Sequence, residues 1–475
     1  MADFLLGIPR TIIPPTDQVK GHVAGWRNGV FINDTWQASR KLTLNLGLRY
    51  ERHTPVKTII GRATELNADQ TQIIPTTIPS PGFEFHDPNN HDFAPRLGAN
   101  YRLTDKTVVR AGFGIYYNPN QLNSLTFLTN NPPIAAVSTF TNDNPARLLS
   151  FENPFGVAGT LGVPDMITPN RHFPNARKDQ WSFDAQHEVF GGTVLDVQYI
   201  HSHTRNLDRS FFNNTPRPGP GAVDSRRPNP RFRSIRTITN DLVADYDAVS
   251  VIVRKRMSHG LQVDASYTWS RTRDMATNSN AGGTTMDQYD IQRDYAPSNW
   301  DVPHRFVVSY IYDTPFFKDS KNALLKLALS GWQLGGITTL QSGVPINVTI
   351  VPDRANTGSA NQRPDVVGTP KADCGGGKLL NCIDASAFAL PAQFTFGNAP
   401  RNVLRGPGLF VTDMALVKSF PLHREAAFQL RVESFNVFNH ANFLNPGSQF
   451  GTATFGRITS AQPMRQVQIG GRLLF

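Results

Sequence analysis

The stretch KLTLNLGLRYE, residues 41–51, decides the fold, because its residues alternate between two chemical classes. The even-numbered residues 42–50 are leucines and one tyrosine, whereas the odd-numbered residues 43–51 are Thr, Asn, Gly, Arg and Glu. A period of two residues is that of a β-strand, and it excludes an amphipathic helix, whose period is about 3.6 residues. We therefore predict a strand with one apolar and one polar face.

The same unit recurs along the chain as hairpins. Alternating segments are joined by short turns at 39–40, 104–106, 191–192 and 258–260, by a longer turn after YIYDTPF at 310–316, and by a turn near Pro421. A last alternating segment, MRQVQIGGRLLF at 464–475, stands alone and ends on an aromatic residue. We predict about thirteen antiparallel strands.

Long polar stretches rich in Pro, Gly and Asn separate the hairpins, at roughly 52–93, 118–178, 204–245, 272–303, 341–408 and 436–463. Loops of this length argue against a compact soluble domain. Short turns that alternate with long loops are typical of an all-β, antiparallel transmembrane β-barrel, with short periplasmic turns and long extracellular loops. A soluble sandwich or propeller is the alternative, and it would have shorter and more even loops.

The composition fits this interpretation. The net charge is +10, but the basic residues are scattered rather than gathered in runs, so we expect no nucleic-acid partner. No apolar run is long enough for a membrane helix, and the first residues, MADFLLGIPRTIIPPTDQ, do not form a signal peptide. Transmembrane strands need only alternate residues to be apolar, so a modest hydrophobic content of 39% is compatible with a barrel.

Strand parity predicts an incomplete barrel. If the last strand runs toward the periplasm, all short turns are periplasmic and the segment 1–28 is the remnant of an extracellular loop. Bacterial single-chain barrels have an even number of strands and begin in the periplasm. We therefore expect an odd number of strands and any signal peptide to be missing, with Met1 an internal start or a fragment boundary.

Five phrases resemble the C-terminal barrel of Oar-like TonB-dependent outer-membrane receptors. They are FINDTWQASRKLTLNLGLRYE, FAPRLGANYRLTDKTVVRAGFGIYY, SNWDVPHRFVVSYIYDTPF, GWQLGGITTLQSGVPINV and RGPGLFVTDMALVKSF…LRVESFNVFNHANF. The resemblance implies a barrel of about 22 strands, a plug domain and a TonB-binding segment. Residues 1–475 would then be a partial receptor barrel without the plug and the other N-terminal domains.

The resemblance also implies the partners and the location of the protein. It implies the bacterial outer membrane, its lipid, the barrel-assembly machinery, and a TonB-type energy-coupling protein that acts through the missing N-terminal part. Phe475, with Leu473 and Ile469, is by resemblance the signal that the assembly machinery reads. The ligand is left open as a small molecule, a glycan or a peptide.

Arginines on the polar faces of the predicted strands are the candidate ligand-binding residues. In the barrel lumen they would attract an anionic ligand or hold the plug. The alternative, which we prefer, is that they form ion pairs with acidic residues on the strands, namely Glu51, Asp184, Asp196, Asp264 and Glu433. The candidates are Arg49, Arg102, Arg110, Arg254, Arg431 and Arg472.

Cys374 and Cys382 lie in a predicted external loop, where an oxidising environment favours a disulfide. Closing so short a loop stabilises it by roughly 2–3 kcal/mol in the chain-entropy model. No further ligands at zinc spacing accompany the two cysteines, and two other groups are weak as metal ligands. We expect no metal site and no cofactor. The weak groups are His201 with His203, and Asp287 with Asp290 and Asp294.

The sequence contains no G-x-S-x-G, no H-E-x-x-H and no phosphate-binding glycine loop, so we expect no enzymatic activity. An outer-membrane protease or lipase would need Asp/His or Ser/His pairs that converge at one rim. The preferred interpretation is energy-coupled import of an unidentified ligand that the external loops capture. The alternative is a passive pore or a surface-adhesion barrel without energy coupling.

Overall fold

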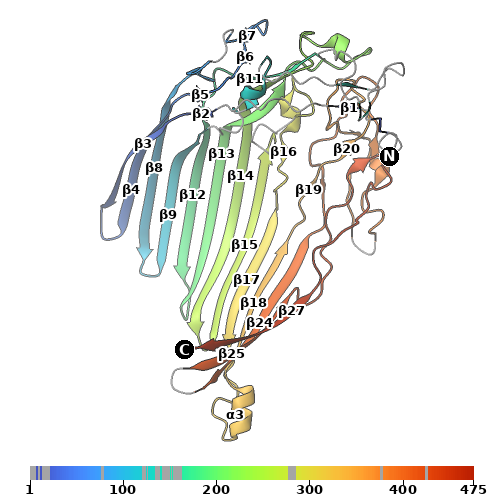
Figure 1. Ribbon diagram of the computed structural model, residues 1–475. Helices are drawn as coiled ribbons and strands as arrows, with labels where there is room; N and C mark the ends of the chain where they lie inside the picture. The colour runs from blue at the N-terminus through green and yellow to red at the C-terminus, as the bar shows by residue number, and fades with distance from the viewer. Residues whose placement is uncertain are drawn as a thin grey trace.

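The computed structural model describes residues 7–8, 11–12, 22–75, 80–119, 125, 127–133, 140–141, 150, 152, 163–276, 285–374, 378–422 and 426–475. One large sheet contains thirteen main strands that are neighbours in the same order as in the chain (Figure 1). This confirms the predicted number and order. The strands are β3 (Arg27–Gln37), β4 (Leu42–His53), β8 (Asn89–Thr104), β9 (Thr107–Asn118), β12 (Ala176–Glu188), β13 (Thr193–Phe212), β14 (Ser234–Ser258), β15 (Leu261–Asp274), β17 (His304–Asp313), β18 (Trp332–Gln341), β24 (Leu409–Pro421), β25 (Ala427–Phe435) and β27 (Gln466–Leu474).

The strand register places the mainly polar faces of neighbouring strands on the same side of the sheet. Asn100, Arg110, Asp184 and Gln198 are successive partners on β8, β9, β12 and β13. Leu97, Phe113, Trp181 and His201 are the corresponding partners on the other face. Because side chains alternate between the faces of a strand, a register slip of one residue would mix the two sets. The alternation seen in residues 41–51 therefore fixes the pairing of the whole sheet.

The two edges of the sheet are β3 and β27, and each has one neighbouring strand among the described residues. Every residue of β3 is exposed, as is every residue of β27 except its last. The twelve pairings between β3 and β27 are all antiparallel, so these two strands run in the same direction. An antiparallel ladder cannot form directly between them.

One end of the sheet carries short turns and the other carries long loops, and the C-terminus lies at the short-turn end (Figure 1). The turn between β17 and β18 is longer and contains the helix α3 (Ala323–Leu329), which the sequence analysis missed. Its residues are good helix formers, and the side chain of Asn322 accepts hydrogen bonds from the backbone N–H of Leu324 and Leu325 at the first turn. None of the helices in the described ranges is long and apolar enough to cross a membrane.

β13 and β14 remain paired well beyond the ends of their neighbours β12 and β15, within the predicted loop at 204–245. β13 continues to Phe212 and β14 begins at Ser234, so the connecting segment is 213–233. Register shifts occur between Thr204 and Leu207 and between Leu207 and Arg209. These irregularities interrupt the alternation, and this is why the sequence pattern gave no strand signal there.

The long loops form a layer with its own small cores. Ile346, Val348, Ile383, Phe388 and Leu404 are buried together in the segments around β18 to β24, and Phe85, Leu125 and Leu128 form a second cluster. The short strands of this layer are β1 (Thr11–Ile12), β2 (His22–Ala24), β5 (Lys57–Ile60), β6 (Glu65–Leu66), β7 (Ile73–Ile74), β10 (Phe140–Thr141), β11 (Asp165–Pro169), β16 (Ala296–Pro297), β19 (Pro345–Ile346), β20 (Thr349–Ile350), β21 (Asp365–Val366), β22 (Phe388–Ala389), β23 (Leu404–Arg405) and β26 (Gln449–Phe450). The 3₁₀ turns are η1 (Phe127–Asn130), η2 (Asp224–Arg226), η3 (Ile291–Asp294) and η4 (Ala385–Ala387).

A tyrosine lies flat over a glycine on the neighbouring strand. Gly336 of β18 is the register partner of Tyr310 of β17. A Cβ atom on Gly336 would lie 2.6 Å from Cζ and the hydroxyl oxygen of Tyr310. A side chain at position 336 would therefore have to displace the ring of Tyr310, which covers the backbone that glycine leaves bare.

Candidate functional site

The six candidate arginines all lie on the polar face of the sheet, and four of them are in ion pairs. Arg49 pairs with Glu51, and Arg431 Nη2 lies 2.7 Å from Glu433 Oε1. Arg110 and Arg254 pair with carboxylates on neighbouring strands. Arg102 and Arg472 are exposed near the short-turn end. The arginines are spread from β4 to β27 and do not converge on one anion site.

The pairs in the middle of the sheet form a ladder across five strands. Arg110 of β9 lies 2.5 Å from Asp184 of β12. Arg254 of β14 lies 3.5 Å from Asp196 of β13 and also 3.5 Å from Asp264 of β15. These contacts agree with the ion-pair interpretation preferred from sequence. Partly exposed pairs such as these contribute little to stability, but they neutralise the polar face.

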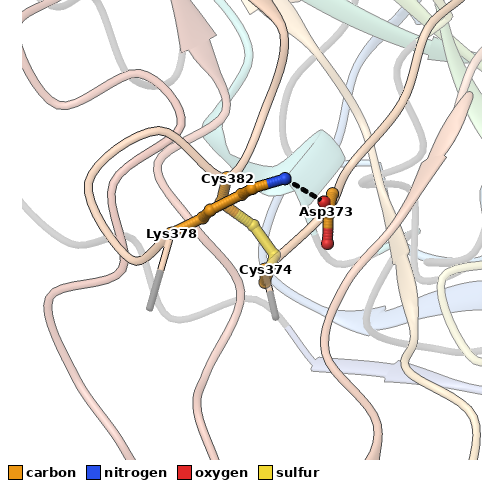
Figure 2. The surroundings of a disulfide bond; sticks show 4 residues. All are labelled: Asp373, Cys374, Lys378 and Cys382. Carbon is orange, nitrogen blue, oxygen red and sulfur yellow. Dashed lines mark hydrogen bonds and ion pairs between the residues drawn. A yellow bond between two sulfur atoms is a disulfide. The ribbon is translucent and has the colours of Figure 1, made fainter. Parts of the chain in front are cut away.

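Cys374 and Cys382 form a disulfide in the loop layer (Figure 2). Beside it, Lys378 Nζ lies 2.6 Å from Asp373 Oδ2, and both side chains are largely exposed. The backbone N–H of Asp373 donates to the carbonyl oxygen of Cys382 at 2.7 Å, so the bridge closes a small hairpin-like loop.

Three of the five weak metal candidates, His201, His203 and Asp294, are in contact with an oppositely charged type of side chain. His201 Nδ1 lies 2.7 Å from Asp247 Oδ1, and His203 Nδ1 lies 2.7 Å from Asp245 Oδ1. Asp294 is paired with Arg363. Among the described residues, no group of three or more His, Cys, Asp or Glu side chains is arranged to hold a metal ion.

Three arginines of the segment between β18 and β24 form ion pairs with aspartates at the end of β15 and in the segment between β15 and β17. No sequence pattern predicted these pairs. The pair of Arg363 with Asp294 is almost fully buried, with 3% and 2% of the two side chains exposed. Burial lowers the pKa of the Arg363 guanidinium, and the charge of Asp294 opposes that shift. The sequence carries no signal for these contacts, because the partners are far apart in the chain. The pairs are Arg363–Asp294, Arg401–Asp274 and Arg405–Asp301.

A cavity of about 810 Å³ lies in the loop layer over the extended ends of β13 and β14. Its wall comes from the segment 65–74 and Phe83, from residues 168–171, and from the strand ends that carry Arg209 and Asp241. We call it the vestibule cavity. Thr204 pairs with Ala244, Leu207 with Leu242 and Arg209 with Thr239, so the two register shifts keep Arg209 on the same face as Thr204. The cavity therefore opens on the polar face of the sheet.

The wall of the vestibule cavity holds four polar atoms that are shielded from solvent and lack a hydrogen-bond partner among the described residues. They are Oε2 of Glu65, Nη1 of Arg209, Oδ1 of Asn213 and Oγ1 of Thr237. Each such atom costs about 1–3 kcal/mol, and native proteins contain few of them. The sequence analysis did not identify this site, because its residues come from separate loops.

Glu65 is the most buried charged group of this wall, with 1% of its surface exposed. Burial raises the pKa of its carboxyl group to about 7, and the nearby Arg171 only partly opposes the shift. Arg171 Nη1 lies 3.4 Å from Glu65 Oε1, too far for a strong ion pair. Glu65 is therefore close to half protonated at neutral pH.

The three proposed assembly-signal residues lie on the exposed edge strand and at its end. Phe475 is 96% exposed, Ile469 is 74% exposed and Leu473 is 54% exposed. Their role in assembly stays a prediction.

Comparison with known proteins gave one family. The outer membrane beta barrel domain matches residues 1–468. No curated protein sequence matches the chain. The solved outer membrane transporter YddB from Escherichia coli is similar in fold, with a TM-score of 0.51 at 9% identity over 94% of this chain and 54% of that one.

Two further solved structures are similar over almost the whole chain. The pyoverdine outer membrane receptor FpvA from Pseudomonas aeruginosa PAO1 has a TM-score of 0.48 at 13% identity, over 96% of this chain and 43% of that one. The FrpB iron transporter from Neisseria meningitidis has a TM-score of 0.46 at 14% identity, over 96% of this chain and 47% of that one. The chain thus spans about half, or less, of the length of these three proteins.

Proposed function

The chain belongs to the outer membrane beta barrel domain family, and from this we propose that it forms part of the wall and the external ligand-capturing loops of a TonB-dependent transport protein. As a member of this family it is a protein of the outer membrane. The apolar face of its sheet then faces lipid, and the polar face with its arginine–carboxylate ladder faces the lumen.

The observation that carries the proposal is the pair of free sheet edges. Because β3 and β27 run in the same direction, an odd number of further strands would close the sheet by antiparallel pairs. About nine more strands would give the roughly 22 strands of plugged outer-membrane transporters. The plug and the TonB-binding segment would belong to the same longer protein, so the energy coupling proposed here depends on parts beyond residues 1–475.

The loop layer supports ligand capture rather than a bare pore. Buried ion pairs such as Arg363–Asp294 hold separate loops together, and the vestibule cavity lies among the loops on the lumenal face. A preformed cavity reduces the entropy that a ligand must lose on binding. The solved structures compared above are named as transporters and receptors, and we propose a transport role without catalysis for this chain.

The proposal is tested on the full gene product, that is, the reading frame that contains these residues together with everything upstream. We expect it to bind the periplasmic domain of TonB in a pull-down and to show no steady conductance in planar lipid bilayers, because a plug closes the lumen. A steady open conductance without TonB binding would instead make the protein a passive pore. A closed barrel without TonB binding would favour surface adhesion.

A further inference from the structure

The vestibule cavity is built from three parts of the chain that meet only in the folded protein. Residues 65–74 come from the loop between β4 and β8, residues 168–171 from the loop between β9 and β12, and the remaining wall from the ends of β13 and β14. β11 pairs in parallel with β14, with Thr168 opposite Thr237, and this pairing fixes one side of the cavity against the other. Its volume of about 810 Å³ is in the usual range of small-molecule sites.

Both arginines of the cavity wall have acidic neighbours. Arg171 Nη1 lies 3.4 Å from Glu65 Oε1, and its Nη2 lies 3.4 Å from Asp87 Oδ1. Asp241 accepts hydrogen bonds from both Nε and Nη2 of Arg209, at 2.6 and 2.8 Å. Arg209 is therefore paired with Asp241, and Arg171 keeps Asp87 beside it when Glu65 is protonated. A strongly anionic cargo would have to compete with these carboxylates for both arginines.

The wall groups that have no hydrogen-bond partner among the described residues include both donors and acceptors. Nη1 of Arg209 can only donate, the amide oxygen of Asn213 can only accept, and the hydroxyl of Thr237 can do both. Glu65 adds a carboxyl group that can donate or accept, because burial brings its pKa to about 7. An alcohol hydroxyl donates and accepts at once, so several hydroxyls on one ligand match this set. Phe83 and Phe211 supply apolar surface for the C–H groups between the hydroxyls.

We propose that the vestibule cavity binds a neutral, polyhydroxylated ligand, of the oligosaccharide class. This inference rests on the proposed transport function and names the chemical class of the cargo. The four atoms are shielded in the unliganded cavity, so binding as proposed requires their side chains, which already line the cavity, to rotate toward the ligand.

The test is a binding titration of the full gene product in detergent with defined probes. The neutral probes are cellohexaose, xylohexaose and maltohexaose, and the anionic probe of similar length is hexagalacturonic acid. We expect at least one neutral probe to bind. Asn213→Ala and Thr237→Val should each weaken that binding by about five- to tenfold, because each removes one hydrogen bond to the ligand.

Two exposed residues of distant loops provide matched controls, Asn381→Ala and Thr395→Val, which should leave binding unchanged. Binding of the anionic probe alone, binding that is unaffected by the cavity variants, or no binding of any neutral probe would each overturn the proposal. These results are separable from the transport proposal. TonB binding with no sugar binding removes the ligand class alone, whereas sugar binding without TonB binding removes the energy coupling alone.

Discussion

At the scale of single residues, burial decides what a charged pair contributes. Arg363 and Asp294 are almost fully covered in the loop layer, whereas Lys378 and Asp373 have 60% and 63% of their side chains exposed. Loss of one partner of a buried pair leaves the other charge without compensation, whereas an exposed charge is solvated by water. Loss of one partner should therefore destabilise the protein at the buried pair Arg363–Asp294 and have little effect at the exposed pair Lys378–Asp373.

Arg363→Met should loosen the segments that this arginine joins, around 285–303 and 352–402. The expected loss is about 3–5 kcal/mol of local stability, because Asp294 stays buried without its partner. Hydrogen–deuterium exchange of these two segments measures it. Lys378→Met is the control and should leave exchange unchanged beyond its own loop. Equal exchange in both variants would show that the buried pair does not hold the loops.

The stability of the loops around Glu65 should fall as the pH rises from 5 to 8. The pKa of Glu65 is raised to about 7 in the folded protein from an ordinary value of 4.5. Between these pH values the folded state binds a proton that the unfolded loop has lost, so folding is favoured on the acid side. Arg171 opposes the shift and Asp87 reinforces it, while Arg209 and Asp241 are paired with each other on the neighbouring strands β13 and β14.

Hydrogen–deuterium exchange of residues 63–67 and 165–171 at several pH values checks this prediction, with Glu65→Gln as the matched variant. The variant keeps the shape of a neutral carboxyl, so the fall in protection should largely disappear. Comparing the pH dependence of the variant with that of the unchanged protein also removes the contribution of other titrating groups near the site. One such group is His86, whose pKa is lowered by burial. A pH dependence of the same size in both proteins would contradict the role given to Glu65.

At the scale of secondary-structure elements, alternation sets the strand faces and close contacts set the exceptions. In the main strands, lipid-facing and lumenal residues alternate with a period of two. Gly336 interrupts this pattern, because the ring of Tyr310 on the neighbouring strand occupies the space of a side chain at this position. The edge strand β27 differs in another way, since all of its residues except Leu474 are exposed and the exposed Phe475 follows it.

Gly336→Ala should destabilise the hairpin of β17 and β18 by about 1–3 kcal/mol, because the new methyl group displaces the ring of Tyr310. The midpoint of chemical unfolding of the refolded barrel measures this loss. Gly470→Ala is the control, since no atom lies within 4 Å of the position that its Cβ would take. If the two variants unfold at the same midpoint, the ring does not depend on glycine at position 336.

Phe475→Ala should reduce the amount of protein assembled in the outer membrane without changing the stability of what is assembled. The side chain is 96% exposed, so its removal takes away few contacts within the chain. The fraction that resists SDS before heating reports assembly in cells. Phe438→Ala, at a phenylalanine that is 65% exposed, is the control. Assembly equal to that of the control would argue against a C-terminal signal.

At the scale of the whole molecule, the direction of the edge strands limits how the barrel closes. β3 and β27 run in the same direction, so the ladder type used by the rest of the sheet is not available to them. Further strands between these edges would satisfy the free backbone groups, which cannot remain unpaired in lipid.

Engineered cysteines at the two edges should therefore not cross-link in the full gene product. In a background with Cys374→Ser and Cys382→Ser, we expect no disulfide between Ile32→Cys and Ile469→Cys, which replace residues on the outer faces of β3 and β27. The positive control joins Val432→Cys to Ile469→Cys, which are register partners on β25 and β27. An efficient cross-link between positions 32 and 469 would mean that the thirteen strands close on themselves.

The pattern of residue types along the chain was enough to predict the sheet. The predicted loop at 341–408 begins at the last residue of β18 and ends one residue before β24, and the predicted turn at 39–40 lies between β3 and β4. This worked because lipid on one side and water on the other impose a two-residue period that can be read locally. Strand number, order and faces all follow from that period.

The loop layer could not be predicted in this way and became visible only in the folded chain. The extension of β13 and β14 through register shifts, the helix α3 and the pairing of Arg363 with Asp294 were not visible in the pattern. The vestibule cavity joins Glu65 to Arg209 and Thr237, which are distant in the chain. These features depend on contacts between segments that are far apart in the chain. The loops do not lie between lipid on one side and water on the other, so their residues show no two-residue period that would reveal the contacts.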